Sequence, residues 1–578
     1  MNFKKYIPIL DWLPNYKKEW FKGDLGAGLT VGIMLIPQGI AYAMIAGLPP
    51  IYGLYTAMIP QIVYAIFGTS RQLAVGPVAM DSLIVASGVA ALAQIGTENF
   101  IEFAILLAFM MGFLQVVFGF FKLGFLVNFL SRPVISGFTS AAALIIGLNQ
   151  LKHLLGVQIE RDNRIHTLVL DAFQNIKEIN WLTFSIGVVS ILILVFLKRI
   201  TTKIPAALVV VVLGIVLVRV FHLDQFGVKI LGEIPKGLPE FTIPKFEKNT
   251  LIDLFPIALT LSFIAFLEAI SVAKAIEIKH TDYKISPNQE LIAIGLGNIV
   301  GSFFQTYPAT GGLSRTAVNN QTGAKTPLAA IISGLIVGVT LLFLTPVFFY
   351  LPKAVLGAII VVAVYGLLDF SMPKELLTYS KRELIILNIT LLVTATVGIK
   401  EGIFIGIILS LAMLIYRSTK PHFAVLGQVK DTHFYRNVNR FEGLLNISDD
   451  ILIVRFDAQL YFANVSFFKD KLDEFVTEKG PQLKLIIIDG ESINSIDSSG
   501  IFMLKDVINK YKNMGIEIAF SGMKGPVRDI LDKSEIIKKI DYSNCFMSIQ
   551  EAVDMFDDRK KNKEIEVKYF DFINQTNR

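Results

Sequence analysis

The chain has 578 residues, 53% hydrophobic and only 18% charged, whereas roughly 25% of the residues in an ordinary soluble domain are charged. Its formal net charge is +6, and a mean hydropathy of +0.58 excludes a large water-soluble fold and a disordered chain. One cysteine and six scattered histidines exclude a disulfide scaffold and give no metal-ligand spacing. The small basic excess fits membrane-protein loops better than nucleic-acid binding.

Residues 1–23 carry several lysines around Trp12 without a clean apolar core, which argues against a signal peptide. We interpret them as a short amphipathic segment on the cytoplasmic surface. Apolar runs then dominate up to residue 417, and past residue 430 charged residues become frequent. The sequence therefore predicts a transmembrane domain over 24–417, a linker over 418–436, a cytoplasmic α/β domain over 437–560 and a charged tail over 561–578.

The apolar runs predict about fourteen spans, because one spanning helix needs about 20 apolar residues. An even number of spans places both termini on one side, and the basic residues of the short loops assign that side to the cytoplasm. We expect a multi-pass protein of the bacterial inner (plasma) membrane. The predicted spans are 24–46, 50–68, 74–94, 101–121, 124–148, 180–198, 204–221, 252–275, 289–304, 312–324, 327–350, 352–370, 382–399 and 401–417.

Two of these spans are interrupted at matching places by glycine and proline. The first interruption lies near 72–77 and the second near 307–312. Because Gly and Pro oppose helix formation, each span is expected to be an extended stretch followed by a half-helix. Unwound backbone is tolerated at membrane depth only where protein or a cavity surrounds it. The pattern favours an inverted repeat with a site at the midplane over two ordinary kinked helices.

Arg315 follows the second interruption and falls in the first turn of the expected half-helix. Helix N-termini attract anions, but a cation is disfavoured there, and any charge is costly at the membrane centre. We interpret Arg315 as an anion-binding residue rather than only an ion-pair partner, although both roles can alternate. Ser314 adds a hydroxyl donor. In the first span, Gln38 and Tyr42 share a helix face, where Gln38 either faces a site or joins two helices.

Two carboxyl groups fall inside predicted spans. Glu268 lies in the middle of a span, where it suits either a group that gains and loses a proton or a buried ion pair with Arg315. Asp81 lies early in the first half-helix, where the helix dipole explains an acid as well as a function does. A functional Asp81 would bind a proton or a cation.

The motifs at these positions resemble those of the sulfate permease (SulP) family across nearly the whole chain. They lie at 23–28, 36–43, 47–55, 68–71, 76–79 and 308–319. The resemblance implies a UraA-like α-helical polytopic fold, with core and gate domains in a seven-plus-seven inverted repeat, and a homodimer. It places the anion at Gln38, Tyr42, Val78, Gly312, Leu313, Ser314 and Arg315, and it gives Glu268 the proton-coupling role. Asp81 departs from the family pattern, which leaves the coupling ion open between a proton and sodium.

The region after residue 430 alternates strands and helices. Strands are predicted at 451–456, 484–489 and 516–521, and helices at 499–514 and 549–556. The turn at 496–500 resembles the loop of the STAS domain, the usual tail of the SulP family. In related anti-sigma-factor antagonists the serine before the glycine is phosphorylated, which would be Ser499 here. Ordinary helix capping is the simpler interpretation of this turn.

These features predict a secondary active transporter of a small oxyanion, with sulfate as substrate, a proton as the coupled ion and alternating access as the mechanism. The alternatives are sodium-dependent bicarbonate uptake, proton-coupled dicarboxylate uptake and, from another class, a membrane sensor or scaffold acting through the STAS domain. No nucleotide-binding glycine motif or nucleophile–base set supports an enzyme or a cofactor. The expected partners are the anion, the lipid bilayer and a second copy of the chain through both domains, but not nucleic acid.

Overall fold

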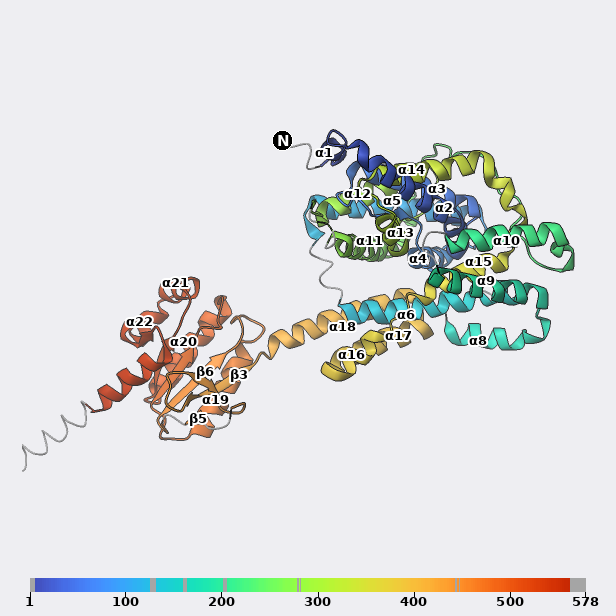
Figure 1. The fold of residues 1–578 in the computed structure, drawn as a ribbon. Coiled ribbons are helices and arrows are strands. Elements are labelled where there is room, and N and C mark those ends of the chain that lie inside the picture. Colours follow the sequence, from blue (N-terminus) through green and yellow to red (C-terminus); the bar gives the residue numbers. More distant parts are fainter. Residues whose placement is uncertain are drawn as a thin grey trace, which may run out of the picture. The chain divides into compact units, whose positions relative to one another are not determined.

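The computed structural model describes residues 6–124, 131–159, 164–200, 205–277, 280, 282–441, 444–445 and 448–561. The chain forms two compact units, Met1–Ser410 and Leu411–Arg578. We call them the membrane unit and the soluble unit and describe each by itself (Figure 1). The division falls at residue 410, within the residue range of α18 (Ile399–Thr419).

Each of the fourteen predicted spans corresponds to a helix of the structure. In chain order the helices are α2 (Phe21–Ala46), α3 (Pro50–Phe67), α4 (Ala79–Ala90), α5 (Glu98–Phe120), α6 (Arg132–Asn149), α9 (Trp181–Ile200), α10 (Ala206–Phe221), α11 (Lys248–Glu277), α12 (Pro287–Ser302), α13 (Leu313–Gln321), α14 (Leu328–Val339), α15 (Lys353–Tyr365), α17 (Lys381–Thr396) and α18. Shorter helices lie before and between them, namely α1 (Ile9–Trp12), α7 (Leu151–Leu155), α8 (Ile165–Gln174) and α16 (Ser371–Tyr379).

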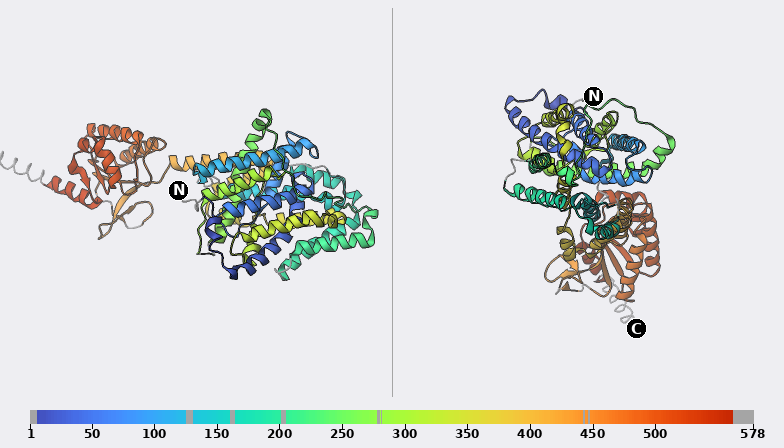
Figure 2. Two further views of the ribbon diagram at one scale, coloured as in Figure 1. Left: turned by 90° about the horizontal axis from the view of Figure 1, so that it is seen from above. Right: turned by 90° about the vertical axis from the view of Figure 1, so that its right-hand side faces the viewer.

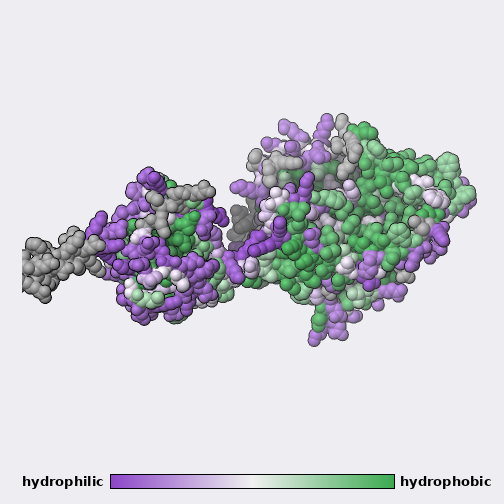
Figure 3. Space-filling model, turned by 90° about the horizontal axis from the view of Figure 1, so that it is seen from below, coloured by the Kyte–Doolittle hydropathy of each residue, from purple (hydrophilic) through white to green (hydrophobic). Residues whose placement is uncertain are grey.

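Six helical segments among the described residues are long and apolar enough to cross a membrane, the longest being Lys248–Glu277. The half-helices α4 and α13 are shorter than a full span, because the chain before each of them is extended. Hydrophobic residues cover much of the visible surface of the membrane unit, whereas hydrophilic residues cover most of that of the soluble unit (Figure 3). This contrast confirms the predicted division into two kinds of domain.

Small residues allow the helices of the membrane unit to approach closely. α2 lies beside α14 and α3, and α5 lies beside α12 (Figure 2). Where α5 crosses α12, a Cβ on Gly112 would lie 2.5 Å from the carbonyl oxygen of Gly295. The crossing therefore requires glycine at this position, as is common for helices packed in membranes.

The two interrupted spans meet at a short antiparallel sheet. β1 (Val75–Gly76) pairs with β2 (Thr310–Gly311), with Val75 opposite Gly311. Each strand leads into a half-helix, and the N-cap residues are Val78 for α4 and Gly312 for α13. Both interruptions predicted from glycine and proline are thus confirmed, and the two short strands that they form are in contact.

The soluble unit is built on a mixed sheet of order β4-β3-β6-β7-β8-β9, with β5 paired to β3. Its strands are β3 (Phe423–Val429), β4 (Tyr435–Asn437), β5 (Leu444–Leu445), β6 (Ile451–Phe456), β7 (Leu485–Asp489), β8 (Glu517–Ser521) and β9 (Cys545–Phe546). Its helices are α19 (Val465–Lys479), α20 (Ser498–Asn513), α21 (Gly525–Lys533), α22 (Ile536–Ile540) and a last helix over 549–561. β3 is antiparallel to β6, and β6 to β9 run parallel.

Alternate residues of β6 pack into different hydrophobic clusters. Leu452 and Val454 belong to one cluster, and Ile451 and Ile453 belong to the other. A central strand buried on both faces explains the continuous apolar runs seen in the sequence. The structure differs from the predicted linker at 418–436, because β3 and the start of β4 lie within it. Their short, mixed sequences lack the clear alternation that identified the central strands.

Candidate anion site

Arg315 is the central residue of the candidate site. It lies in the first turn of α13, and its side chain is buried, with the residue only 2% exposed. Its Nη1 donates hydrogen bonds to the backbone oxygen of Pro77, at 3.0 Å, and to Oε1 of Gln38, at 3.4 Å. Nε and Nη2 are buried and have no hydrogen-bond partner among the described residues. Because a buried charged donor is costly to leave unpaired, these two nitrogens are the donors in the site best suited to an acceptor.

The backbone around Arg315 comes close to its guanidinium group. A Cβ on Gly312 would lie 2.6 Å from Nη2 of Arg315, and one on Gly76 would lie 3.5 Å from it. The hydroxyl of Thr316 donates to the carbonyl oxygen of Gly312, at 2.7 Å, and accepts from the backbone N–H of Ala74, at 3.0 Å. The first turn of α13 is thus tied to the residue that precedes β1, the strand that leads into α4. The N-termini of both half-helices lie beside the guanidinium group, which favours an anion there.

Glu268 faces this site from α11. The residue is partly exposed, and its Oε2 is buried without a hydrogen-bond partner in the part of the chain that the structure describes. The charge of Arg315 acts on Glu268 and on Tyr42, but no salt bridge joins Arg315 to Glu268. Arg315 and Glu268 therefore interact at a distance greater than that of a salt bridge. A bound anion, or a proton on Glu268, would change the strength of this interaction.

Asp81 is a second carboxyl group without a partner. It lies in the first turn of α4, is fully buried, and neither of its oxygens has a hydrogen-bond partner among the described residues. The charge of Glu268 acts on it. Next to it in the chain, the hydroxyl of Ser82 shares a hydrogen bond of 3.1 Å with the hydroxyl of Tyr307. Asp81 therefore belongs to the surroundings of Glu268 rather than to those of Arg315.

The structure brings most of the predicted site residues together. Gln38 contacts Arg315, Tyr42 lies within reach of its charge, Val78 is a buried N-cap, and Gly312 packs against the guanidinium group. Two others are placed differently, because Leu313, 59% exposed, and Ser314, also exposed, turn away from the buried face of α13. Both of these residues lie on the first turn of the half-helix beside Arg315.

Sequence reasoning did not select Tyr307 or Ser82. Tyr307 is fully buried, and Tyr42, Arg315 and Asp81 all lie within electrostatic range of it. Its position at the start of the second interruption was the only signal in the sequence, since an aromatic residue in an apolar span is otherwise unremarkable.

Side-chain hydrogen bonds hold the extended segment before α13 from several directions. Asn298 of α12 pairs with both backbone groups of Ala309, accepting from its N–H at 2.8 Å and donating to its oxygen at 2.9 Å. The hydroxyl of Thr56 on α3 accepts from the backbone N–H of Tyr307 at 3.0 Å. These bonds satisfy a buried, non-helical backbone, as membrane depth requires.

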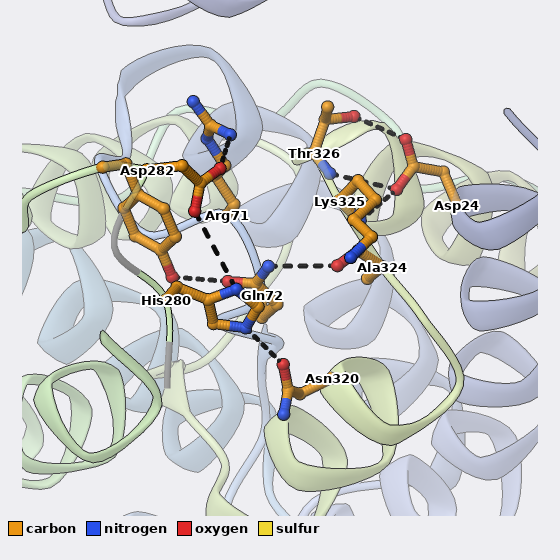
Figure 4. A network of polar contacts seen from close by, with 10 residues as sticks. Asp24, Arg71, Gln72, His280, Asp282, Asn320, Ala324, Lys325 and Thr326 are labelled. Atoms are coloured by element: carbon orange, nitrogen blue, oxygen red, sulfur yellow. Dashed lines mark hydrogen bonds and ion pairs between the residues drawn. The ribbon is translucent and has the colours of Figure 1, made fainter. Parts of the chain in front are cut away.

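A network of polar contacts joins the start of α2 to both interrupted spans (Figure 4). Asp24, fully buried near the start of α2, accepts hydrogen bonds from the backbone N–H groups of Lys325 and Thr326. The side chain of Gln72 donates to the backbone oxygen of Ala324 at 3.0 Å. Farther along, Arg71 forms an ion pair with Asp282, and a ring nitrogen of His280 bonds to Oδ1 of Asn320. The network holds both interrupted spans in place.

The remaining predicted site residue, Ser499, lies in the first turn of α20 and is partly exposed. The N-cap of this helix is Asp497, whose Oδ1 accepts from the backbone N–H of Gly500 at 2.8 Å. Helix capping is thus carried out by the aspartate, in agreement with the simpler interpretation of this turn. Within the described ranges, no three His, Cys, Asp or Glu side chains come together in a group that could hold a metal ion.

Comparisons with known proteins agree with this architecture. The model of the sulfate permease family matches residues 21–390, and that of the STAS domain matches 444–552. The chain is 39% identical over 584 residues to sulfate transporter 4.1, chloroplastic, of Arabidopsis thaliana, with 98% of this chain and 84% of that one covered. It is 32% identical over 578 residues to sulfate transporter 3.1 of the same plant, with 96% and 87% covered. The murine Solute Carrier 26 family member A9 anion transporter, solved in the inward-facing state, matches with a TM-score of 0.87 and 27% identity, over 95% of this chain and 93% of that one.

These findings correct one expectation and confirm another. The expected bacterial inner membrane is contradicted, because these two curated relatives are proteins of Arabidopsis thaliana, one of them named as chloroplastic. The expected family is confirmed, because its model covers more than half of the chain and relatives above 30% identity span nearly all of it. With its paired half-helices, its buried Arg315 and its STAS tail, the chain belongs to the sulfate permease family of anion transporters.

Proposed function

We propose that the protein transports sulfate across a membrane and that Arg315 binds the anion. The observation that carries this proposal is the pair of buried guanidinium nitrogens, Nε and Nη2, which have no partner within the described ranges and lie beside the first turns of α4 and α13. A tetrahedral oxyanion supplies acceptors to such a guanidinium fork and to free backbone N–H groups. The names of the plant relatives, which are sulfate transporters, support the same substrate.

We propose further that Glu268 couples a proton to the anion. In the empty site, ionised Glu268 balances the charge of Arg315. When sulfate binds Arg315, it supplies the negative charge itself, so Glu268 loses its counterion and takes up a proton. The anion and the proton then bind together and leave together, which makes the process symport. Gln38 and Tyr42 complete the wall of the site.

The remaining parts of this proposal rest on the family. Alternating access would move the core segments that carry the anion, α4 and α13, past gate helices such as α6 and α15. The transporter would work as a homodimer in the bilayer, with contacts through the membrane unit and the STAS domain. Chemical cross-linking in membranes, with mass determination of the product, tests the dimer.

The transport proposal is tested by uptake of radiolabelled sulfate into liposomes that contain the purified protein. We expect uptake to rise when the outside is acidic and to be indifferent to sodium.

Arg315→Gln should lower uptake about 100-fold, because it removes charge-assisted hydrogen bonds worth about 2–3 kcal/mol. Glu268→Gln should abolish the acid stimulation. Lys245→Gln is the control, since its side chain is 68% exposed. Protein that moves no anion under any proton or sodium gradient would contradict the proposal.

Asp81 favours a second candidate, which is sodium-dependent bicarbonate uptake. Its two buried oxygens have no partner among the described residues, and the charge of Glu268 acts on them. Carboxylate oxygens of this kind suit a hard cation such as sodium. In this case bicarbonate uptake requires sodium, and Asp81→Asn abolishes the requirement. Proton-coupled dicarboxylate uptake is distinguished in the same assay by competition with a four-carbon dicarboxylate. Sodium-independent uptake discards the sodium candidate.

A further inference from the structure

A single buried hydroxyl links the segment of Arg315 to the helix of Glu268. Thr310 is fully buried and begins β2. Its Oγ1 donates a hydrogen bond of 2.7 Å to the backbone oxygen of Ala265 on α11. Thr310 precedes Arg315 in the chain, and Ala265 lies one helical turn before Glu268, so Ala265 and Glu268 share a helix face.

The other bonds on this segment lead elsewhere. Asn298 holds Ala309 to α12, Thr56 holds Tyr307 to α3, and the pairing with β1 holds Gly311. Among the hydrogen bonds of the described residues, that of Thr310 is the only one from a side chain of 307–316 to α11. The position of α11 along the β2 strand is therefore set by packing and by this one directional bond.

The separation of Arg315 and Glu268 depends on that position. The two groups form no direct salt bridge, and they act on each other across a gap. Coulomb energy varies inversely with distance and is large in a site with little water, so a small shift of α11 along β2 changes how strongly each group feels the other. The bond of Thr310 resists such a shift, because breaking it would leave a fully buried hydroxyl without a partner.

We propose that Thr310 is a positioning residue, whose hydrogen bond to Ala265 keeps Arg315 and Glu268 at a constant separation so that anion binding and proton uptake stay coupled. This inference rests on the proposed function above. Without the bond, only packing opposes a shift of α11 along β2, and sulfate binds Arg315 while Glu268 keeps its charge. The expected defect is slippage, in which sulfate moves without a proton.

The test compares three variants in liposomes. Thr310→Val keeps the shape of the side chain and removes the donor, whereas Thr310→Ser keeps the donor. Thr56→Val is the matched control, because Thr56 is an equally buried threonine that holds the same extended segment from the α3 side. Two quantities are measured, the ratio of sulfate uptake with acid outside to uptake at equal pH, and the proton entry that a sulfate gradient drives.

We expect Thr310→Val to transport sulfate with loss of acid stimulation and of sulfate-driven proton entry, and Thr310→Ser to restore both. Thr56→Val should lower the maximal rate and keep the wild-type ratio. If Thr310→Val does not fold, Thr310→Ala is measured in its place. A wild-type ratio in the Thr310 variant, or equal loss in both valine variants, overturns the inference alone. A wild-type protein without acid stimulation overturns the proposed coupling, and this inference with it.

Discussion

At the scale of single residues, the candidate site depends on small side chains as much as on charged ones. The backbone of Gly76 and Gly312 comes close to the guanidinium group of Arg315, whose Nε and Nη2 have no hydrogen-bond partner among the described residues. A charged residue could be selected from the sequence, since a cation at membrane depth is rare. The importance of Gly312 could not be read from the sequence, because only the structure shows that a Cβ there would collide with the guanidinium group.

Gly312→Ala is expected to displace the guanidinium group. The new Cβ would lie 2.6 Å from Nη2, which is closer than van der Waals contact allows. Because the end of the arginine side chain is flexible, the protein should fold while the donors move out of place. We expect sulfate uptake to fall about 10- to 100-fold, with nearly unchanged thermal stability in detergent. Gly26→Ala is the control, because nothing lies within 4 Å of a Cβ at that position, and equal activity of the two variants would contradict this account.

At the scale of elements, the sequence predicted the spanning helices well. It did not predict the strand pairing and the side-chain hydrogen bonds that hold them in place. The interruptions near 72–77 and 307–312 could be read from glycine and proline, and the structure places β1 and β2 there. Their pairing could not be read, because it joins segments that are far apart in the chain. The same holds for the polar side chains that satisfy the unwound backbone. Glu290 illustrates the point, since an acid at the start of α12 looks like an ordinary helix N-terminal residue.

Glu290→Ala is expected to destabilise the membrane unit. This carboxylate is fully buried, and it accepts from the hydroxyl of Tyr64 and from both the N–H and the hydroxyl of Thr69. Its loss leaves several buried donors without an acceptor, at a cost of about 3–5 kcal/mol. The measurement is the midpoint of thermal unfolding in detergent. Glu98→Ala, at an exposed first-turn position of α5, should cost less than about 1 kcal/mol, and a similar shift in both variants would refute the role of Glu290.

At the scale of the whole molecule, the two units are stabilised by different forces. The membrane unit buries polar backbone and relies on side chains such as Asp24 and Asn298 to satisfy it. The soluble unit packs a conventional hydrophobic core on both faces of its sheet. Several polar contacts of the soluble unit lie near its surface and depend on ionised carboxylates. Because these carboxylates titrate in contact with water, acid should lower the stability of the soluble unit.

Asp457 is the carboxylate that we expect to make the soluble unit sensitive to acid. Burial opposes its ionisation, but hydrogen bonds from Arg455, at 2.6 Å, and from His422, at 2.7 Å, outweigh burial and lower its pKa. Because the pKa is lower in the folded state, the stabilisation is fully present above the unfolded pKa of about 4. It is lost as the pH falls through the folded value.

Asp457→Asn should therefore lower the stability of β6 by about 1 kcal/mol at neutral pH. The readout is hydrogen exchange of the β6 amides in the full-length protein, which should speed up several-fold at neutral pH. The difference from wild type should shrink in acid, where wild-type Asp457 is also protonated. Asp470→Asn, at an exposed position of α19, is the control. A difference that does not depend on pH would show that Asp457 acts without its charge.

The sequence alone determined the division into a membrane and a soluble unit, the spans and the two interruptions, and it selected Arg315 and Glu268 as candidate site residues, because hydropathy, helix-breaking residues and charges at membrane depth are local properties of the chain. Only the tertiary structure decided that β1 pairs with β2, that Nε and Nη2 of Arg315 lack partners among the described residues, and that Thr310 bonds to α11. These facts concern distances between segments far apart in the sequence. They follow from how the helices pack, which no local pattern encodes.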